Sequence, residues 1–188
     1  MFSVCSADTK YTGQTMYEEL ADKIWNYENS LYDPAINNWK DTREQGEVVS
    51  SNPIGSVAWC HGAAGVLYSR ILCYEFAENK KWKNRLEQDI KRAYKKLKEY
   101  WKRDSDSLCH GNCGNLLILK IAQKKMKEYG ISVEREWDVE LMKNALEEQI
   151  VHLLPQEQIN FGFMNGYGGI LYKRLQGMNV VESHIELI

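Results

Sequence analysis

The sequence lacks any apolar run long enough to cross a membrane. Its apolar stretches are short and interrupted, whereas a spanning helix needs about 20 consecutive apolar residues. The first residues, from Met1 to Ser6, also lack the basic segment and apolar core of a secretory signal peptide. We therefore predict a cytoplasmic protein without a transmembrane segment.

The chain also lacks a strong excess of positive or negative charge. The chain has 24 Lys and Arg residues against 26 Asp and Glu residues, so its net charge of −2 gives no basis for nucleic-acid binding. The one basic run, from Lys91 to Lys98, has apolar positions at helical spacing. We interpret it as the solvated face of a helix.

Proline is scarce, and so is the alternation typical of strands. Only three prolines occur among 188 residues, and no segment sustains a two-residue hydrophobic period. Periodicity near 3.6 residues predicts an all-α fold, and we expect one domain that covers residues 1–188. The first helix has an apolar face formed by Met16, Leu20, Ile24 and Tyr27. The later helices are expected at Val66–Glu78, Trp82–Trp101, Leu116–Tyr129, Trp137–Leu154 and Gly169–Gln176.

A glycine-bearing motif occurs three times. The first two copies, Trp59–Gly65 (WCHGAAG) and Leu108–Gly114 (LCHGNCG), share Cys-His-Gly and lie 49 residues apart (109 − 60). The third, Met164–Gly169 (MNGYGG), has neither Cys nor His. Neighbouring repeats place the same turn on the same side of a fold, so ligands that are distant in sequence can converge.

Helices of two kinds alternate along the chain. Each motif precedes an apolar helix, and long charged amphipathic helices lie between them. This pattern predicts a buried inner layer and a half-exposed outer layer, arranged as a solenoid or a ring of helix pairs. The motif glycines serve either close backbone approach or simple packing.

Cysteines and histidines are few enough to sort individually. Cys73 lies in an apolar helical run and is expected in the core, and Cys5 lies at the chain end. We interpret His152 as a packed helix residue and assign His184 to the C-terminal tail. The remaining candidates are Cys60, His61, Cys109, His110 and Cys113.

Zinc is the metal that these residue types favour. A catalytic site has three protein ligands and an open position, which Cys60, Cys109 and His110 would supply. Cys113 is a rival ligand, because a fourth protein ligand would close the site and make it structural. Another reading makes all of them buried thiols and core histidines without a metal. The spacing leaves these alternatives open.

At these residues the chain resembles the lanthionine synthetase C-like cyclases. Segments 59–65, 108–114 and 162–170 are similar to the last three motifs of that family, particularly in the C-terminal cyclase domain of class II bifunctional lanthipeptide synthetases. Segment 38–43 (NWKDTR) also resembles this subgroup.

The resemblance implies an α/α toroid of helix pairs whose inner helices begin at the glycine motifs. It implies that Cys60, Cys109 and His110 bind Zn²⁺ and that Cys113 does not. The implied reaction adds a cysteine thiolate of a precursor peptide to dehydroalanine or dehydrobutyrine, giving lanthionine or methyllanthionine. His61 would act as the acid, or would only support Cys60. The implied partners are a dehydrated lanthipeptide precursor and the N-terminal part of such a synthetase.

The chain also departs from the family pattern. Three motifs cannot form the family's seven helix pairs, and the upstream histidine motif and aspartate region have no counterpart. Ser56 occupies a position that is arginine in some members. We therefore expect a C-terminal fragment, a partial toroid with weak or no catalysis alone.

Three other functions compete with this one. The first is a non-catalytic, zinc-binding remnant that still binds peptide. The second is a toroid of the protein prenyltransferase β-subunit type, which uses Asp, Cys and His ligands rather than the set available here. The third is a purely structural zinc module, which needs Cys113 as its fourth ligand.

Overall fold

A computed structural model of the chain describes residues 15–41, 54–132 and 161–177. These residues form five helices, namely α2 (Thr15–Ser30), α3 (Ala63–Phe76), α4 (Lys80–Tyr100), α5 (Asn112–Glu128) and α7 (Tyr167–Gly177). Two antiparallel ladders of two-residue strands pair β1 (Tyr32–Asp33) with β2 (Asn38–Trp39) and β3 (Val57–Ala58) with β4 (His61–Gly62). The all-α prediction is confirmed, while closure into a ring stays a prediction. The expected helix Trp137–Leu154, with His152, lies outside the described residues, as do Cys5 and His184.

Three helices begin earlier than their periodicity predicts, inside the glycine motifs. The starts are Ala63 instead of Val66, Asn112 instead of Leu116, and Tyr167 instead of Gly169. The first N–H groups of a helix have no intrahelical acceptor. Glycine in the first turn therefore lowers the stability of the helix less than glycine in its middle. The motifs therefore form both the turn and the start of the following helix.

Glycine is needed where each motif turn passes under its own helix. A Cβ on Gly65 would lie 2.2 Å from the Trp59 carbonyl oxygen, and one on Gly114 would lie 1.7 Å from that of Leu108. In the third copy, a Cβ on Gly169 would lie 2.1 Å from the carbonyl oxygen of Phe163. The same six-residue offset recurs in every copy, which confirms that these glycines allow close backbone approach.

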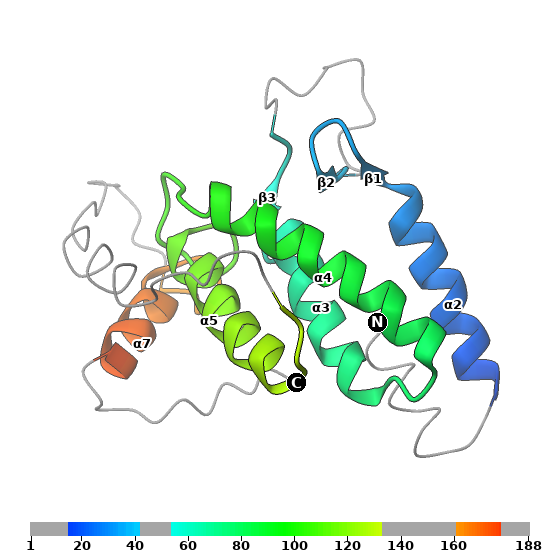
Figure 1. The fold of residues 1–188 in the computed structure, drawn as a ribbon. Coiled ribbons are helices and arrows are strands. Elements are labelled where there is room, and N and C mark those ends of the chain that lie inside the picture. Colours follow the sequence, from blue (N-terminus) through cyan, green and yellow to red (C-terminus); the bar gives the residue numbers. More distant parts are fainter. Residues whose placement is uncertain (1–14, 42–53, 133–160, 178–188) are drawn as a thin grey trace.

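The core lies between α3, α4 and α5, with α2 and α7 on opposite sides of them (Figure 1). In α5 every residue from Asn112 to Leu119 is buried, so this half of the helix is enclosed on all sides. In α4 the buried apolar residues instead follow one stripe, Leu86, Ile90, Ala93, Tyr94 and Leu97. The predicted difference between an inner and an outer helix is thus present.

The basic run in α4 mostly faces solvent, as predicted, with one exception. Lys96 is only 3% exposed, and its ammonium group donates to the carbonyl oxygen of Ile36 at 2.8 Å. It also lies 4.1 Å from the centre of the Tyr100 ring. Lys96 therefore connects α4 to the β1–β2 hairpin.

A buried ionic network joins α2, α3 and α4. Arg70 of α3 is fully buried and pairs with Asp89 of α4 at 3.1 Å and with Glu28 of α2. The side-chain amide of Asn29 also donates to Asp89, at 3.2 Å. A buried guanidinium needs such partners because removing a charge from water is costly. The network fixes α2 against the two core helices.

The apolar face predicted for the first helix lies largely in solvent. Met16, Leu20 and Tyr27 are 61%, 43% and 60% exposed. Ile24, the fourth residue of that face, does pack, together with Ala21 and Trp25. Periodicity identified the helix but not the side that neighbouring helices cover.

Two further expectations can be compared with the structure. Cys73 is 1% exposed and packs against Leu86, as predicted for a core residue. None of the described helices is both long and apolar enough to cross a membrane.

Candidate metal centre

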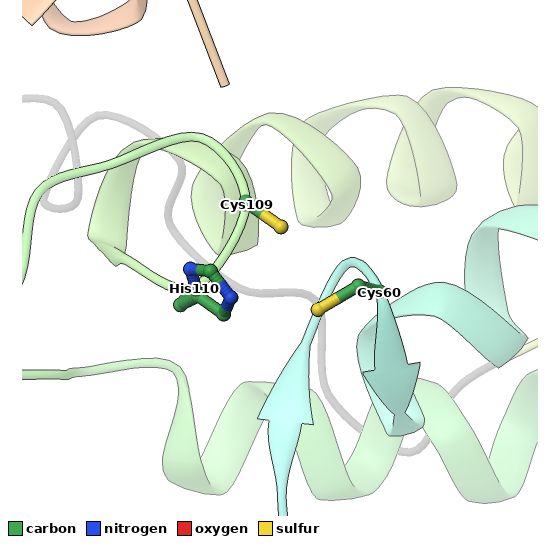
Figure 2. Close-up of side chains that lie close together, drawn as sticks. All are labelled: Cys60, Cys109 and His110. Atoms are coloured by element: carbon green, nitrogen blue, oxygen red, sulfur yellow. The ribbon is translucent and has the colours of Figure 1, made fainter. Parts of the chain in front are cut away.

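Three of the predicted ligands converge at one point. Cys60 lies in the turn between β3 and β4, and Cys109 and His110 lie in the turn that precedes α5 (Figure 2). The two sulfur atoms and one ring nitrogen of His110 lie within 4.8 Å of one another. Two sulfurs bound to one tetrahedral Zn²⁺ lie about 3.8 Å apart, since each Zn–S bond is about 2.3 Å. Small side-chain rotations would therefore fit this donor set to zinc.

Main-chain hydrogen bonds join the two turns that carry the predicted ligands. The amide of Trp59 donates to the carbonyl oxygen of Cys109 at 2.9 Å, and the amide of Cys109 donates to that of Met164 at 2.9 Å. The three motif turns are thus hydrogen-bonded in series. Met164 and Asn165 occupy the positions that Cys109 and His110 hold in the second copy, so the third turn supports the site without a thiolate or an imidazole.

Cys60 lies in a hairpin that requires glycine. Val57 pairs with Gly62 and Ala58 with His61, which leaves Trp59 and Cys60 as the two-residue connection. Gly62 has φ of 76°, and a Cβ there would lie 1.8 Å from the carbonyl oxygen of Ser56. Glycine adopts this backbone conformation at low cost, and the resulting tight turn directs Cys60 toward the second turn.

The second turn is fixed by the buried side chain of Asn112. Its Nδ2 donates to the carbonyl oxygen of Arg103 at 2.9 Å and to Asp106 at 2.8 Å, and its Oδ1 accepts from the Arg103 amide at 2.7 Å. The backbone amide of His110 donates to the Ser107 hydroxyl at 3.2 Å. These bonds hold the backbone that carries Cys109 and His110.

Cys113 is separate from this group. It lies in the first turn of α5, is 4% exposed, and packs with Leu108 and Leu117. The group of close donors found among residues 15–41, 54–132 and 161–177 does not include it. This arrangement favours three protein ligands over four.

His61 lies beside the three predicted ligands, where it contacts one of them, Cys60, and the carboxylate of Asp41. Its Nδ1 is 2.9 Å from the Cys60 sulfur, and its Nε2 is 3.5 Å from a carboxylate oxygen of Asp41. The ring centres of His61 and His110 are 6.3 Å apart. Sequence reasoning selected His61 but gave Asp41 no role. The only signal for Asp41 was its place in segment 38–43.

Comparison with known proteins finds one matching family and one relative that is a biosynthesis protein. The profile of the family described as "Lanthionine synthetase C-like protein" matches residues 1–185. The chain is 28% identical over 176 residues to the Lacticin 481/lactococcin biosynthesis protein LcnDR2 of Lactococcus lactis subsp. lactis. This alignment covers 87% of the chain but only 18% of the relative, so the chain spans less than a fifth of that protein's length. No solved structure matches the chain significantly.

Proposed function

The chain belongs to the lanthionine synthetase C-like family, and from this premise we propose that it takes part in forming thioether rings in a lanthipeptide precursor. The observation that carries the proposal is the convergence of Cys60, Cys109 and His110 from two motif turns. A site of two sulfurs and one imidazole suits zinc and leaves one position for a substrate sulfur.

The metal would be held by those three side chains. When bound, zinc would supply the positive charge that lowers the pKa of an incoming thiol, which is a modest nucleophile near pH 7. Cys113 is not part of the proposed set. Because the ligands lie at neighbouring turns joined by backbone hydrogen bonds, the chain itself sets their separation.

The reaction is an addition without net oxidation or reduction. The peptide thiol loses its proton, and its sulfur bonds to the β-carbon of dehydroalanine or dehydrobutyrine. The alkene electrons move toward the neighbouring carbonyl, and the α-carbon then takes up a proton. His61 is the proposed proton donor because its imidazole lies next to Cys60 and is held on its other side by Asp41.

The contact between His61 and Cys60 also fits a second role, in which His61 only orients this ligand. The variant His61→Ala separates the two roles. An acid role predicts that zinc stays bound while thioether formation falls by about 100-fold or more. An orienting role predicts weaker zinc binding and a parallel loss of activity.

Metal content of the full chain is the first test. After anaerobic purification we expect one zinc per chain and, with cobalt in its place, sulfur-to-metal charge-transfer bands. Cys60→Ala, Cys109→Ala and His110→Ala should each lose tight binding. Cys113→Ala is the matched control and should retain both metal and spectrum. A chain without stoichiometric metal, or a Cys113→Ala variant that loses it, contradicts the open three-ligand site.

Thioether formation is the second test. A synthetic peptide with one cysteine and one dehydroalanine is mixed with the zinc-loaded chain, and the loss of free thiol is followed by alkylation and mass. A rate above the uncatalysed background supports the proposed reaction. Our proposed partners are a dehydrated precursor and the remainder of such a synthetase, and we place the reaction in the cytoplasm, where thiols stay reduced.

The second candidate is a zinc-binding module that holds the peptide without cyclising it. Two exposed rings near the third turn favour it, since Phe161 is 74% exposed and Phe163 is 42% exposed. They lie next to Met164, whose carbonyl oxygen accepts a hydrogen bond from the Cys109 amide. Exposed aromatic rings suit apolar peptide side chains. Peptide binding by the zinc-loaded chain without thiol loss would identify this function.

A further inference from the structure

We propose that Asp41 is a positioning residue that holds the His61 imidazole in one orientation beside Cys60. This inference rests on the proposed function, because it gives Asp41 a task only if His61 serves the site. Asp41 lies 20 residues before His61 (61 − 41), in a segment without a metal ligand.

The first support is the geometry around the imidazole. One ring nitrogen faces the Cys60 sulfur at 2.9 Å and the other faces the Asp41 carboxylate at 3.5 Å. Rotating the ring by half a turn would place carbon atoms where both nitrogens now lie. The two contacts therefore select the same orientation of the ring.

The second support is the burial of the pair. The side chain of Asp41 is 9% exposed and that of His61 is 19% exposed. Ion pairs in full contact with water contribute little, because solvent screens them. A shielded carboxylate interacts more strongly with a nearby N–H group and is itself costly to leave without a partner. The contact is thus suited to fix the ring.

The third support is that the backbone leading to Asp41 is itself held against the hairpin that carries His61. Asn38 is fully buried, and its Nδ2 donates to the carbonyl oxygens of Ile54 and Ser56 at 3.1 and 2.8 Å. Trp39 is 3% exposed and packs in the core. Segment 38–41 is therefore anchored at Asn38 and Trp39, which leaves the Asp41 carboxylate little freedom to move away from His61.

A direct metal role for Asp41 fits the structure less well. The described group of close donor atoms contains Cys60, Cys109 and His110 but not Asp41. The Asp41 carboxylate instead faces Nε2 of His61. Asp41 thus acts through His61.

Nitrogen NMR of the full chain tests this proposal. The sequence has only four histidines, so ¹⁵N-histidine labelling gives a simple imidazole spectrum, and His61→Gln assigns the signals of residue 61. Both zinc-loaded and metal-free chain are measured. We expect a single His61 ring species whose Nε2–H exchanges slowly with water. Asp41→Ala should speed this exchange about ten-fold or more, and Asp41→Asn, which keeps an acceptor oxygen but no charge, about three-fold.

The matched control is Asp33→Ala. Asp33 lies on β1, where it pairs with Lys40 at 3.1 Å and accepts from the Ala35 amide at 2.9 Å. Its loss disturbs the hairpin that leads to Asp41 but removes no contact with His61. A positioning role predicts that Asp33→Ala leaves the His61 signals unchanged. If Asp41→Ala does not fold, Asp41→Asn and Asp33→Ala provide the comparison.

Two outcomes would overturn the proposal. One is an exchange rate in Asp41→Ala, or in Asp41→Asn if that variant alone folds, within error of the wild-type rate. The other is an equal change in Asp33→Ala, which would make the effect one of general hairpin stability. Zinc content is measured separately on the same samples. A wild-type chain that binds no zinc refutes the proposed function, while the metal-free spectra still decide whether Asp41 orients His61.

Discussion

At the scale of single residues, one missing methyl group allows the second motif turn to form. The site of a Cβ on Gly114 lies 1.7 Å from the carbonyl oxygen of Leu108, the residue before a proposed ligand. We predict that Gly114→Ala displaces this turn, destabilises the chain by about 3 kcal/mol or more, and abolishes tight cobalt binding. Urea unfolding and cobalt titration measure the two effects.

Gly130 provides the control for this substitution. It follows α5 with φ of 69°, and a Cβ there would meet nothing within 4 Å. Gly130→Ala should cost about 1 to 2 kcal/mol from backbone conformation alone and should leave metal affinity intact. Equal losses of cobalt binding in both variants would contradict the role assigned to Gly114.

Tyr129 makes stability depend on alkaline pH. Burial raises the pKa of Tyr129 above its usual value near 10, Lys125 opposes this shift, and Glu75 and Glu128 add to it. Above about pH 10 the unfolded chain loses the phenol proton first, so folded stability falls as pH rises. We predict a smaller fall in Tyr129→Phe, measured by urea unfolding between pH 9 and pH 11. An unchanged slope would show that this phenol does not contribute.

The sequence revealed some of the residues of the candidate site but not others. Cys60, Cys109 and His110 were predictable because they occupy equivalent positions in a repeated motif, and repeats place equivalent turns side by side. Asp41 was not, since its contact with His61 joins positions 20 residues apart and follows no period. The bond between Cys109 and Met164 was equally invisible, because a backbone carbonyl leaves no mark in the residue type.

At the scale of elements, the buried network around Arg70 determines how α2 is attached. Asp89 is 2% exposed and pairs with Arg70, whereas Arg92 approaches Asp89 only from solvent at 3.8 Å. We predict that Asp89→Ala destabilises the chain by about 3 to 5 kcal/mol, because it removes a partner from a buried charge. Arg92→Ala should cost at most about 1 kcal/mol. Chemical unfolding of both variants compares these values, and similar costs would refute the distinction.

The helices were largely predictable, but their ends and orientations were not. Hydrophobic periodicity located α3, α4 and α5, because each buries enough apolar surface to show a pattern. It could not show that α3 and α5 begin inside glycine motifs, where close approach outweighs helix propensity. The paired strands escaped detection because two residues are too few to alternate.

At the scale of the whole molecule, α2 presents apolar surface to water. Met16, Leu20 and Tyr27 lie along one side of the helix and are at least 43% exposed. Exposed apolar patches promote association, so we predict concentration-dependent self-association of the chain, measured by sedimentation velocity. Leu20→Glu should reduce it while changing stability by less than about 0.5 kcal/mol. Identical sedimentation of the variant and wild type would exclude this face as the cause.

The hydrogen bonds from Trp59 to Cys109 and from Cys109 to Met164 have a consequence for how the molecule unfolds. Each turn that bears a proposed ligand depends on its neighbour for a main-chain partner, and the middle turn is continuous with α5. Heating should therefore release the cation and melt that helix in a single cooperative step. A zinc-loaded chain would then lose its helical signal and its metal at one common temperature.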